Sequence, residues 1–210
     1  MVDLLIPGPE GKIEAKYSHN NNLKSPIAII LHPDPSRGGT MNTKIVFKLF
    51  KIFVSNGFST IRFNFRGVGK SEGIYDNGEG ELSDAASVLD WLQQYNTNSK
   101  ICWVVGFSFG AWVAMQLLMR RPEINGFVSV SPPANLRDFS FLDIIQVSKC
   151  YLKRLHMEKK WKYKLYIDGL LGAGLRGGVS LLLYLLLLHL TDGATLEKSK
   201  IKISIKTKIL

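Results

Sequence analysis

Residues 106–110 read Gly106-Phe107-Ser108-Phe109-Gly110, between an apolar run at 101–105 and a stretch whose apolar residues have helical spacing. A serine flanked by glycines between a strand and a helix is typical of a nucleophile elbow, a sharp turn with the serine at its apex. Such a turn leaves no room for side chains two residues before and after the serine. The pattern predicts that Ser108 is a nucleophile. A strand–helix turn with a capping serine is the alternative.

The first 130 residues alternate between strand and helix signals. Continuous apolar runs are typical of strands that are buried on both faces, and they occur at 27–31 and 101–105. Residues 60–65 and 126–130 indicate two further strands. Alternation of polar and apolar residues at 12–17 predicts an edge strand. Helical periodicity is present at 43–56, 82–92 and 108–121. This order predicts an α/β fold, a mostly parallel sheet with helices on both faces.

Acyl transfer by a serine also needs donors for the oxyanion that forms during the reaction. The amide of Phe109, at the start of the helix, is one candidate donor. The loop after Leu31 begins His32-Pro33-Asp34-Pro35. Pro33 and Pro35 have no N–H, so the amide of Asp34 is the backbone donor between them. The alternative is a proline-rich turn without a chemical role.

Four motifs give the chain a family resemblance over residues 27–133. They are the stretch 31–41 with its paired prolines and glycines, the Arg- and Gly-rich stretch 62–73, the stretch 78–84, and the elbow. In this order they resemble the α/β-hydrolase superfamily, most of all small cap-free bacterial hydrolases related to dienelactone hydrolases and the Xaa-Pro peptidase-like domain. The resemblance implies hydrolysis of an ester, or less often an amide, through an acyl-enzyme at Ser108.

No cofactor or metal is expected. The glycine-rich stretch 66–73 lacks the spacing of a phosphate-binding P-loop, so its glycines indicate close backbone packing. No cluster of His, Cys and Asp has the spacing of metal ligands. The partner that the resemblance implies is a small-molecule ester.

The base and the acid of the triad are harder to place. The resemblance implies an acid after a later strand and a histidine near the end, but neither motif is present in its usual form. His32 and His19 precede Ser108, which is the wrong order. Among the residues that follow, Asp168 after a possible strand at 164–167 is the candidate acid. His189 is the candidate base, ahead of His156.

The composition changes near residue 150. Residues 1–150 carry 15 Lys and Arg against 13 Asp and Glu, whereas residues 151–210 carry 12 against 4. We therefore divide the chain into a hydrolase core at 1–149 and a basic, Leu-rich tail at 150–210. In one interpretation the tail rebuilds the triad in an unusual way. In the other, the tail is not family sequence and results from a shifted reading frame or a degraded gene. In the second case we expect the sheet to be incomplete on its C-terminal side, and the protein to be a catalytically dead or binding-only hydrolase.

Charge and hydropathy also bear on location. Because the positive charge belongs to the tail, a nucleic-acid-binding face of the core is not expected. The run 177–191 lacks charged residues over 15 positions, whereas a spanning helix needs about 20, so membrane association through it is the less favoured hypothesis. The first residues show no secretory signal. Two cysteines without a disulfide framework favour the cytoplasm.

Overall fold

A computed structural model describes residues 1–142 and 165–169 of the chain. Within these residues the strands are β1 (Val2–Gly8), β2 (Gly11–Ser18), β3 (Ile27–Leu31), β4 (Ser59–Phe63), β5 (Cys102–Phe107), β6 (Gly126–Val130) and β7 (Leu165–Gly169). They form one sheet in the order β1-β2-β4-β3-β5-β6-β7. The four strands β4, β3, β5 and β6 are mutually parallel, so their carboxyl ends share one edge.

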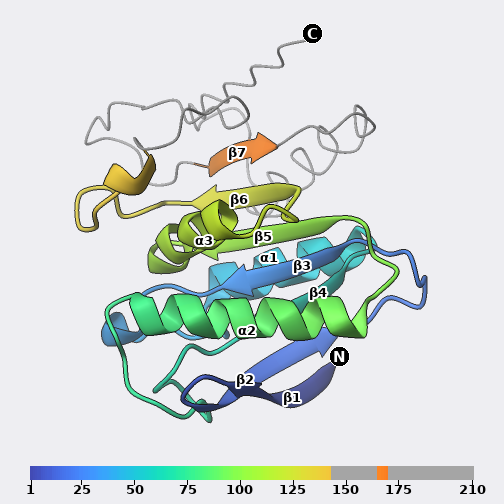
Figure 1. Cartoon of the computed structure of the whole chain (residues 1–210), viewed down its shortest axis with the longest axis horizontal. Helices are drawn as coiled ribbons and strands as arrows, with labels where there is room; N and C mark the ends of the chain where they lie inside the picture. The colour runs from blue at the N-terminus through green and yellow to red at the C-terminus, as the bar shows by residue number, and fades with distance from the viewer. Residues whose placement is uncertain (143–164, 170–210) are drawn as a thin grey trace, which may run out of the picture.

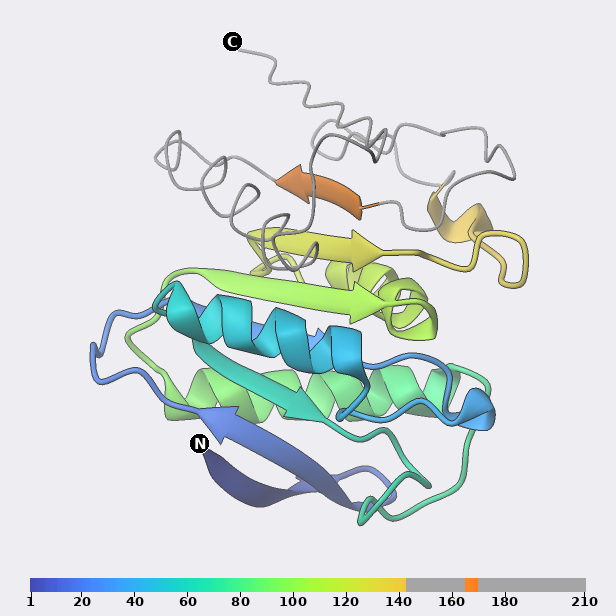
Figure 2. The same ribbon diagram turned by 180° about the vertical axis from the view of Figure 1, so that it is seen from behind.

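Helices cover both faces of this sheet. Helix α1 (Lys44–Ser55) lies on one face, and α2 (Glu79–Tyr95) and α3 (Phe109–Arg120) lie on the other, as the two opposite views show (Figures 1 and 2). Short 3-10 turns occupy Pro35–Arg37 and Ser140–Leu142. The α/β fold predicted from the sequence, a mostly parallel sheet with helices on both faces, is confirmed.

Strand β3 illustrates why the sheet is buried in this way. All five of its residues are buried. Ile27, Ile29 and Leu31 belong to the core beneath α2 and α3, whereas Ala28 and Ile30 belong to the core beneath α1. Because successive side chains of a strand point to opposite faces, a strand between two helical layers is apolar at every position. The continuous apolar runs therefore predicted β3 and β5 correctly.

The outer strands differ from the sequence-based expectation. The stretch 12–17 is not an edge strand, because β1 pairs with β2 on its outer side in an antiparallel hairpin. The first residues lack polar–apolar alternation, so no periodic signal marked them as a strand. Pro7 in β1 is compatible with an edge position, where a missing N–H costs no ladder bond.

The possible strand at 164–167 is present as β7, which pairs with β6 in antiparallel orientation. One segment of the predicted tail therefore joins the sheet of the core. His156, His189 and the run 177–191 lie outside the described residues, and the division at residue 149 stays a prediction. Among residues 1–142 and 165–169, no helix has the length and hydrophobicity needed to cross a membrane.

Candidate active site

The turn between β5 and α3 has the geometry of a nucleophile elbow. Ser108 has φ 54° and ψ −118°, a backbone conformation that is strained for any residue other than glycine. Its amide donates to the carbonyl of Val130 at the end of β6, at 2.9 Å. The serine is partly exposed at the carboxyl edge of the sheet. The predicted position of Ser108, at a strained strand-to-helix turn on this edge, agrees with the structure.

The two flanking glycines are required by close backbone packing. A Cβ atom on Gly106 would collide with the backbone of Gly110 and Ala111 at the start of α3. A Cβ atom on Gly110 would lie 2.6 Å from the carbonyl oxygen of Leu31 and closer still to that of His32. Real Cβ contacts are longer than this, so only glycine allows α3 to begin against the ends of β3 and β5.

The two candidate oxyanion donors have no hydrogen-bond acceptor among the described residues. The carbonyl of Asp34 accepts the amides of Arg37 and Gly39 at 3.1 and 2.9 Å, and its carboxylate accepts the amide of Ser36 at 3.0 Å. These bonds close the turn around Asp34, but its own amide donates to no group among the described residues. The same is true of the Phe109 amide. Convergence of both amides on one point near the Ser108 oxygen stays a prediction.

His32 is a buried anchor of the oxyanion loop. Its Nε2 accepts the amide of Phe65 at 3.0 Å, so Nδ1 carries the proton and donates to the carbonyl of Pro33 at 2.6 Å. Burial lowers the pKa of His32 to about 4. A neutral imidazole with both nitrogens engaged fixes the loop that carries Asp34, and it has no free nitrogen to activate Ser108.

Backbone strain is concentrated at this edge. Among the described residues, the non-glycine residues with positive φ are Asn77 at 57°, Ser108 at 54° and Ser131 at 49°. Ser131 directly follows β6, and Asn77 precedes α2. Strained residues persist only where the surrounding structure holds them, and they cluster at functional sites. The strain at Ser108 and at two further residues of this edge supports the assignment of the elbow as the reactive region.

Arg137, which the sequence analysis missed, joins several parts of this edge. Its guanidinium donates to the hydroxyl of Tyr75 at 2.7 Å and to the carbonyl of Asn77 at 3.1 Å, and it lies 3.5 Å from the carboxylate of Asp34. It also covers the ring of Phe109 at 5.0 Å. No local pattern marks an arginine whose partners are 60 and 103 residues away.

The glycine-rich stretch 66–73 has the structural role that its sequence predicted. Arg66 and Asp84 form a buried ion pair at 2.8 Å, and the same carboxylate accepts the amide of Arg66 at 3.0 Å. A Cβ atom on Gly69 would collide with Glu14 and Asn64. The stretch therefore packs its backbone closely against β2 and α2.

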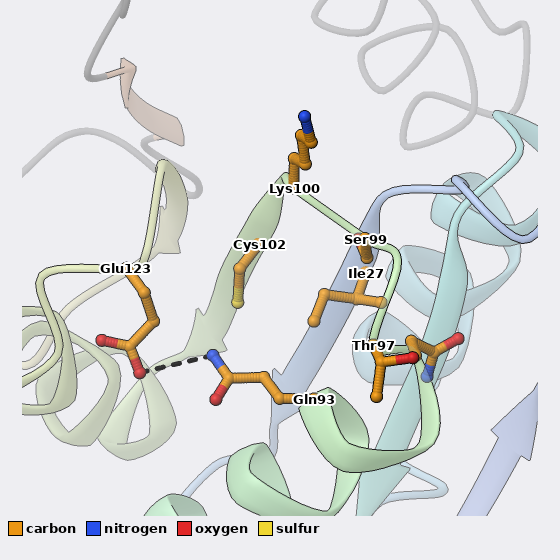
Figure 3. A pocket seen from close by; sticks show the side chains of 8 residues that line it. Ile27, Gln93, Thr97, Ser99, Lys100, Cys102 and Glu123 are labelled. Atoms are coloured by element: carbon orange, nitrogen blue, oxygen red, sulfur yellow. Dashed lines mark hydrogen bonds between the residues drawn. The ribbon is translucent and has the colours of Figure 1, made fainter.

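A small pocket lies at the opposite, amino edge of the sheet (Figure 3). It has a volume of about 190 Å³ and is lined by the first residues of β3 and β5 and by the end of α2, among others Ile27, Cys102, Gln93 and Glu123. Burial raises the pKa of the Cys102 thiol to about 12, so this thiol is not a nucleophile at neutral pH. The pocket is separate from the elbow.

The candidate acid is not brought to the elbow by its backbone position. Asp168 pairs with Phe127, three residues before Val130 along β6. Since β7 runs antiparallel to β6, the chain at Asp168 leads toward the amino edge. Its role as the acid, and that of His189 as the base, stay predictions. The described part of the chain holds no group of His, Cys, Asp and Glu suited to a metal ion.

Comparison with known proteins agrees with this geometry. A family model described as alpha/beta hydrolase fold matches residues 31–149. The uncharacterized protein RP471 of Rickettsia prowazekii is 53% identical over 145 residues, which are 68% of this chain and 61% of RP471. The chain thus spans less than two thirds of that relative's length.

Two solved structures are similar to the chain. One is the crystal structure of ATU1826 from Agrobacterium tumefaciens, a protein of unknown function, with 57% identity and a TM-score of 0.66 over 67% of this chain and 65% of that one. The other is XC6422 from Xanthomonas campestris, described as an α/β serine hydrolase without a lid. It has 32% identity and a TM-score of 0.61 over 66% and 64% of the two chains.

Proposed function

Because the chain belongs to the α/β-hydrolase fold family, we propose that it cleaves an ester bond through an acyl-enzyme at Ser108. The observation that supports this most is the strained elbow at Ser108, beside two backbone amides that have no partner among the described residues. An amide aimed at a developing oxyanion needs to be free in the unliganded protein. Similarity to a lid-free serine hydrolase at 32% identity supports the same chemistry.

The proposed reaction has two halves. The Ser108 oxygen attacks the ester carbonyl carbon, and the amides of Asp34 and Phe109 bind the oxyanion of the tetrahedral intermediate. The C–O bond to the leaving group then breaks, and the alcohol departs with the proton that Ser108 gave up. Water releases the acid and regenerates Ser108. A base must carry the proton in both halves. His189 is the proposed base, and Asp168 is the proposed acid even though its backbone pairs with Phe127, three residues before the end of β6.

Hydrolysis of p-nitrophenyl acetate by the full chain tests this proposal. We expect turnover that is lost in Ser108→Ala and in His189→Ala and is retained in His156→Ala. Turnover that survives Ser108→Ala would refute the assignment of the nucleophile. Turnover that is lost in Ser108→Ala but survives His189→Ala would refute the assignment of the base alone.

A catalytically dead, binding-only hydrolase is the second candidate, and one observation favours it. Among the described residues the histidines are His19 and His32, and neither is available to Ser108. His32 is fully engaged, and His19 bonds to the hydroxyl of Tyr17 at 2.9 Å near the amino edge. A serine without a base keeps only the contribution of the oxyanion donors. In that case the chain would bind an ester without hydrolysing it.

The proposed partner is a small-molecule ester or, less often, an amide, and the proposed location is the cytoplasm. The free thiol of Cys102 is compatible with a reducing compartment. Fractionation of cells that express the full chain would test this location. Recovery of the chain in the membrane fraction after a high-salt wash would contradict it and favour membrane association through 177–191.

A further inference from the structure

Two of the most exposed large apolar side chains of the described residues stand at the carboxyl edge of the sheet. Ile74 is 81% exposed in the loop before α2, and Leu136 is 57% exposed in the loop after β6. Both loops lie at the end of the sheet toward which the arrowheads of β3 and β6 point (Figure 1). Single exposed apolar residues are common on proteins, so their meaning depends on how their loops are placed.

Arg137 holds the two loops together. It follows Leu136 directly, and its guanidinium bonds to Tyr75, the residue after Ile74, at 2.7 Å. The same guanidinium covers the rings of Phe109 and Trp112 at 5.0 and 5.1 Å. Phe109 is the residue after the nucleophile. Arg137 therefore ties the loop that carries Ile74 to the loop that carries Leu136, above the first turn of α3.

The loop before α2 is rigid on its own account. The buried carboxylate of Glu81 accepts the amides of Asp76 and Gly78 at 2.9 and 2.7 Å. The carboxylate of Asp76 in turn accepts the amide of Gly80 at 3.0 Å. These bonds hold the loop in one conformation. Ile74, which is exposed, lies two residues before the first of these anchored positions.

The loop after β6 is fixed in a similar way. The indole of Trp112 donates to the carbonyl of Asp138 at 2.7 Å, and the amide of Leu136 donates to the carbonyl of Pro133 at 2.9 Å. A preorganised surface loses little conformational entropy when a ligand binds. Two exposed apolar side chains on preorganised loops are the expected form of a binding surface for an apolar group.

The charge of this region is balanced. The guanidinium of Arg137 lies 3.5 Å from the carboxylate of Asp34, and the two side chains are only 20% and 16% exposed. A negatively charged acyl group would meet the carboxylate as well as the guanidinium, whereas an uncharged chain would meet Ile74 and Leu136. The rim formed by these two residues therefore fits an apolar chain better than a charged one.

We propose that Ile74 and Leu136 form an apolar rim that receives the acyl chain of the ester, so that the substrates are esters of medium-chain apolar acids. Arg137 is the positioning residue of this rim, since it joins the two loops without touching the reacting atoms. This inference rests on the proposed function at Ser108.

The test is the acyl-chain preference of the full chain. The ratio of kcat/KM for p-nitrophenyl octanoate to that for the acetate is measured for the wild type and for the double variant Ile74→Ser/Leu136→Ser. We expect the ratio to exceed one in the wild type, because each methylene of the acyl chain that is buried strengthens binding about fourfold. In the double variant we expect the ratio to fall about tenfold, which corresponds to the loss of between one and two buried methylenes. Leu23→Ser is the matched control, since Leu23 is 69% exposed in the loop before β3, at the other edge of the sheet, and it should leave the ratio unchanged.

Arg137→Ala should lower the same ratio, and Arg137→Lys should not restore it, because an ammonium group cannot span the same three partners. Arg121→Ala is the matched control, since Arg121 is 23% exposed and ion-paired at the amino edge. The proposed rim would be refuted by an octanoate-to-acetate ratio near one in the wild type. It would also be refuted if the ratio were the same in the wild type and in the double variant.

A binding measurement separates this inference from the proposed function. The Ser108→Ala chain is titrated with the fluorescent fatty acid 11-dansylaminoundecanoic acid, with and without Ile74→Ser/Leu136→Ser. Binding that weakens about tenfold in the double variant supports the rim even if no ester is hydrolysed. Unchanged or absent binding overturns it. So does a dimer of the wild type that dissociates in the double variant, because the rim would then be an interface between two copies.

Discussion

The carboxyl and amino edges of the sheet differ in how their residues are constrained. At the carboxyl edge, Ser108, Asn77 and Ser131 hold strained backbone conformations, and two amides remain without partners among the described residues. At the amino edge, a pocket lies beside Cys102, but its thiol is protonated at neutral pH and its Gln93 amide donates to the Glu123 carboxylate. A hollow in the surface is therefore a poorer guide to reactivity here than strain and unsatisfied donors are.

Two ion pairs allow this contrast to be tested. Their substitution is expected to give the largest change in the free energy of unfolding. The Arg66–Asp84 pair near the carboxyl edge is buried, with side chains 5% and 2% exposed, whereas the Arg121–Asp90 pair near the amino edge is 23% and 50% exposed. Asp84→Ala would leave a buried guanidinium unpaired and should reduce the free energy of unfolding by about 3–5 kcal/mol. Asp90→Ala should cost about 0.2–1 kcal/mol.

Urea denaturation of the two variants measures both values. If the two substitutions cost the same, the carboxyl edge is not the more constrained one, and the contrast between the edges fails. Arg66→Met/Asp84→Leu is a useful third variant, because replacing both charges with apolar side chains should recover much of the loss.

Glycine substitutions sharpen the comparison further. Gly106→Ala should destabilise the protein by about 3 kcal/mol, at the upper end of overpacking costs, because the new methyl group meets backbone that cannot move aside. Gly57→Ala, near the amino edge, meets nothing closer than 3.7 Å and should cost only about 1 kcal/mol for its φ of 84°. Thermal unfolding of both variants measures the difference. A mild effect of Gly106→Ala would show that the elbow is less tightly packed than described.

The two edges should also respond differently to acid. The pKa of His32 is about 4 in the folded protein, below the value near 6.5 of an unfolded histidine. Between these values the unfolded chain binds the extra proton, so stability is lost as the pH falls from 6.5 toward 4. The free energy of unfolding changes by up to about 1.36 kcal/mol for each pH unit, so it should decrease by about 2 kcal/mol between pH 6.5 and pH 5.

The measurement is urea denaturation at pH 6.5, 5.75 and 5. His32→Gln should lose most of this pH dependence, because its neutral amide can still accept the amide of Phe65. His19→Gln, which replaces an exposed histidine at the amino edge, should keep it. Equal slopes in the wild type and His32→Gln would contradict the role of His32 as a buried neutral anchor.

The sequence predicted the parts of the molecule that local patterns determine. The apolar runs predicted β3 and β5, the helical periodicity predicted the three helices, and the glycines around Ser108 predicted the elbow. These features follow from spacing along the chain, which decides whether neighbouring residues are buried together.

The features that the sequence did not predict depend on distant residues. The pairing of β1 with β2 makes an edge strand from residues that lack alternation. The bonds of Arg137 to Tyr75, Asn77 and Asp34 join three loops, and no local sequence pattern predicts these bonds. The position of Asp168 on an antiparallel strand depends on which way β7 runs, and alternation along a strand does not encode its direction.

Ser108, and no group at the amino edge, is the proposed reactive nucleophile, and the function proposed for the protein depends most on this assignment. The most direct measurement is mass spectrometry of the intact full chain after treatment with an alkyl fluorophosphonate, followed by peptide mapping. We expect a single phosphonyl adduct on Ser108, present in the wild type and in Cys102→Ala and absent in Ser108→Ala. An adduct on another residue, or no adduct on the folded wild type, would contradict the account.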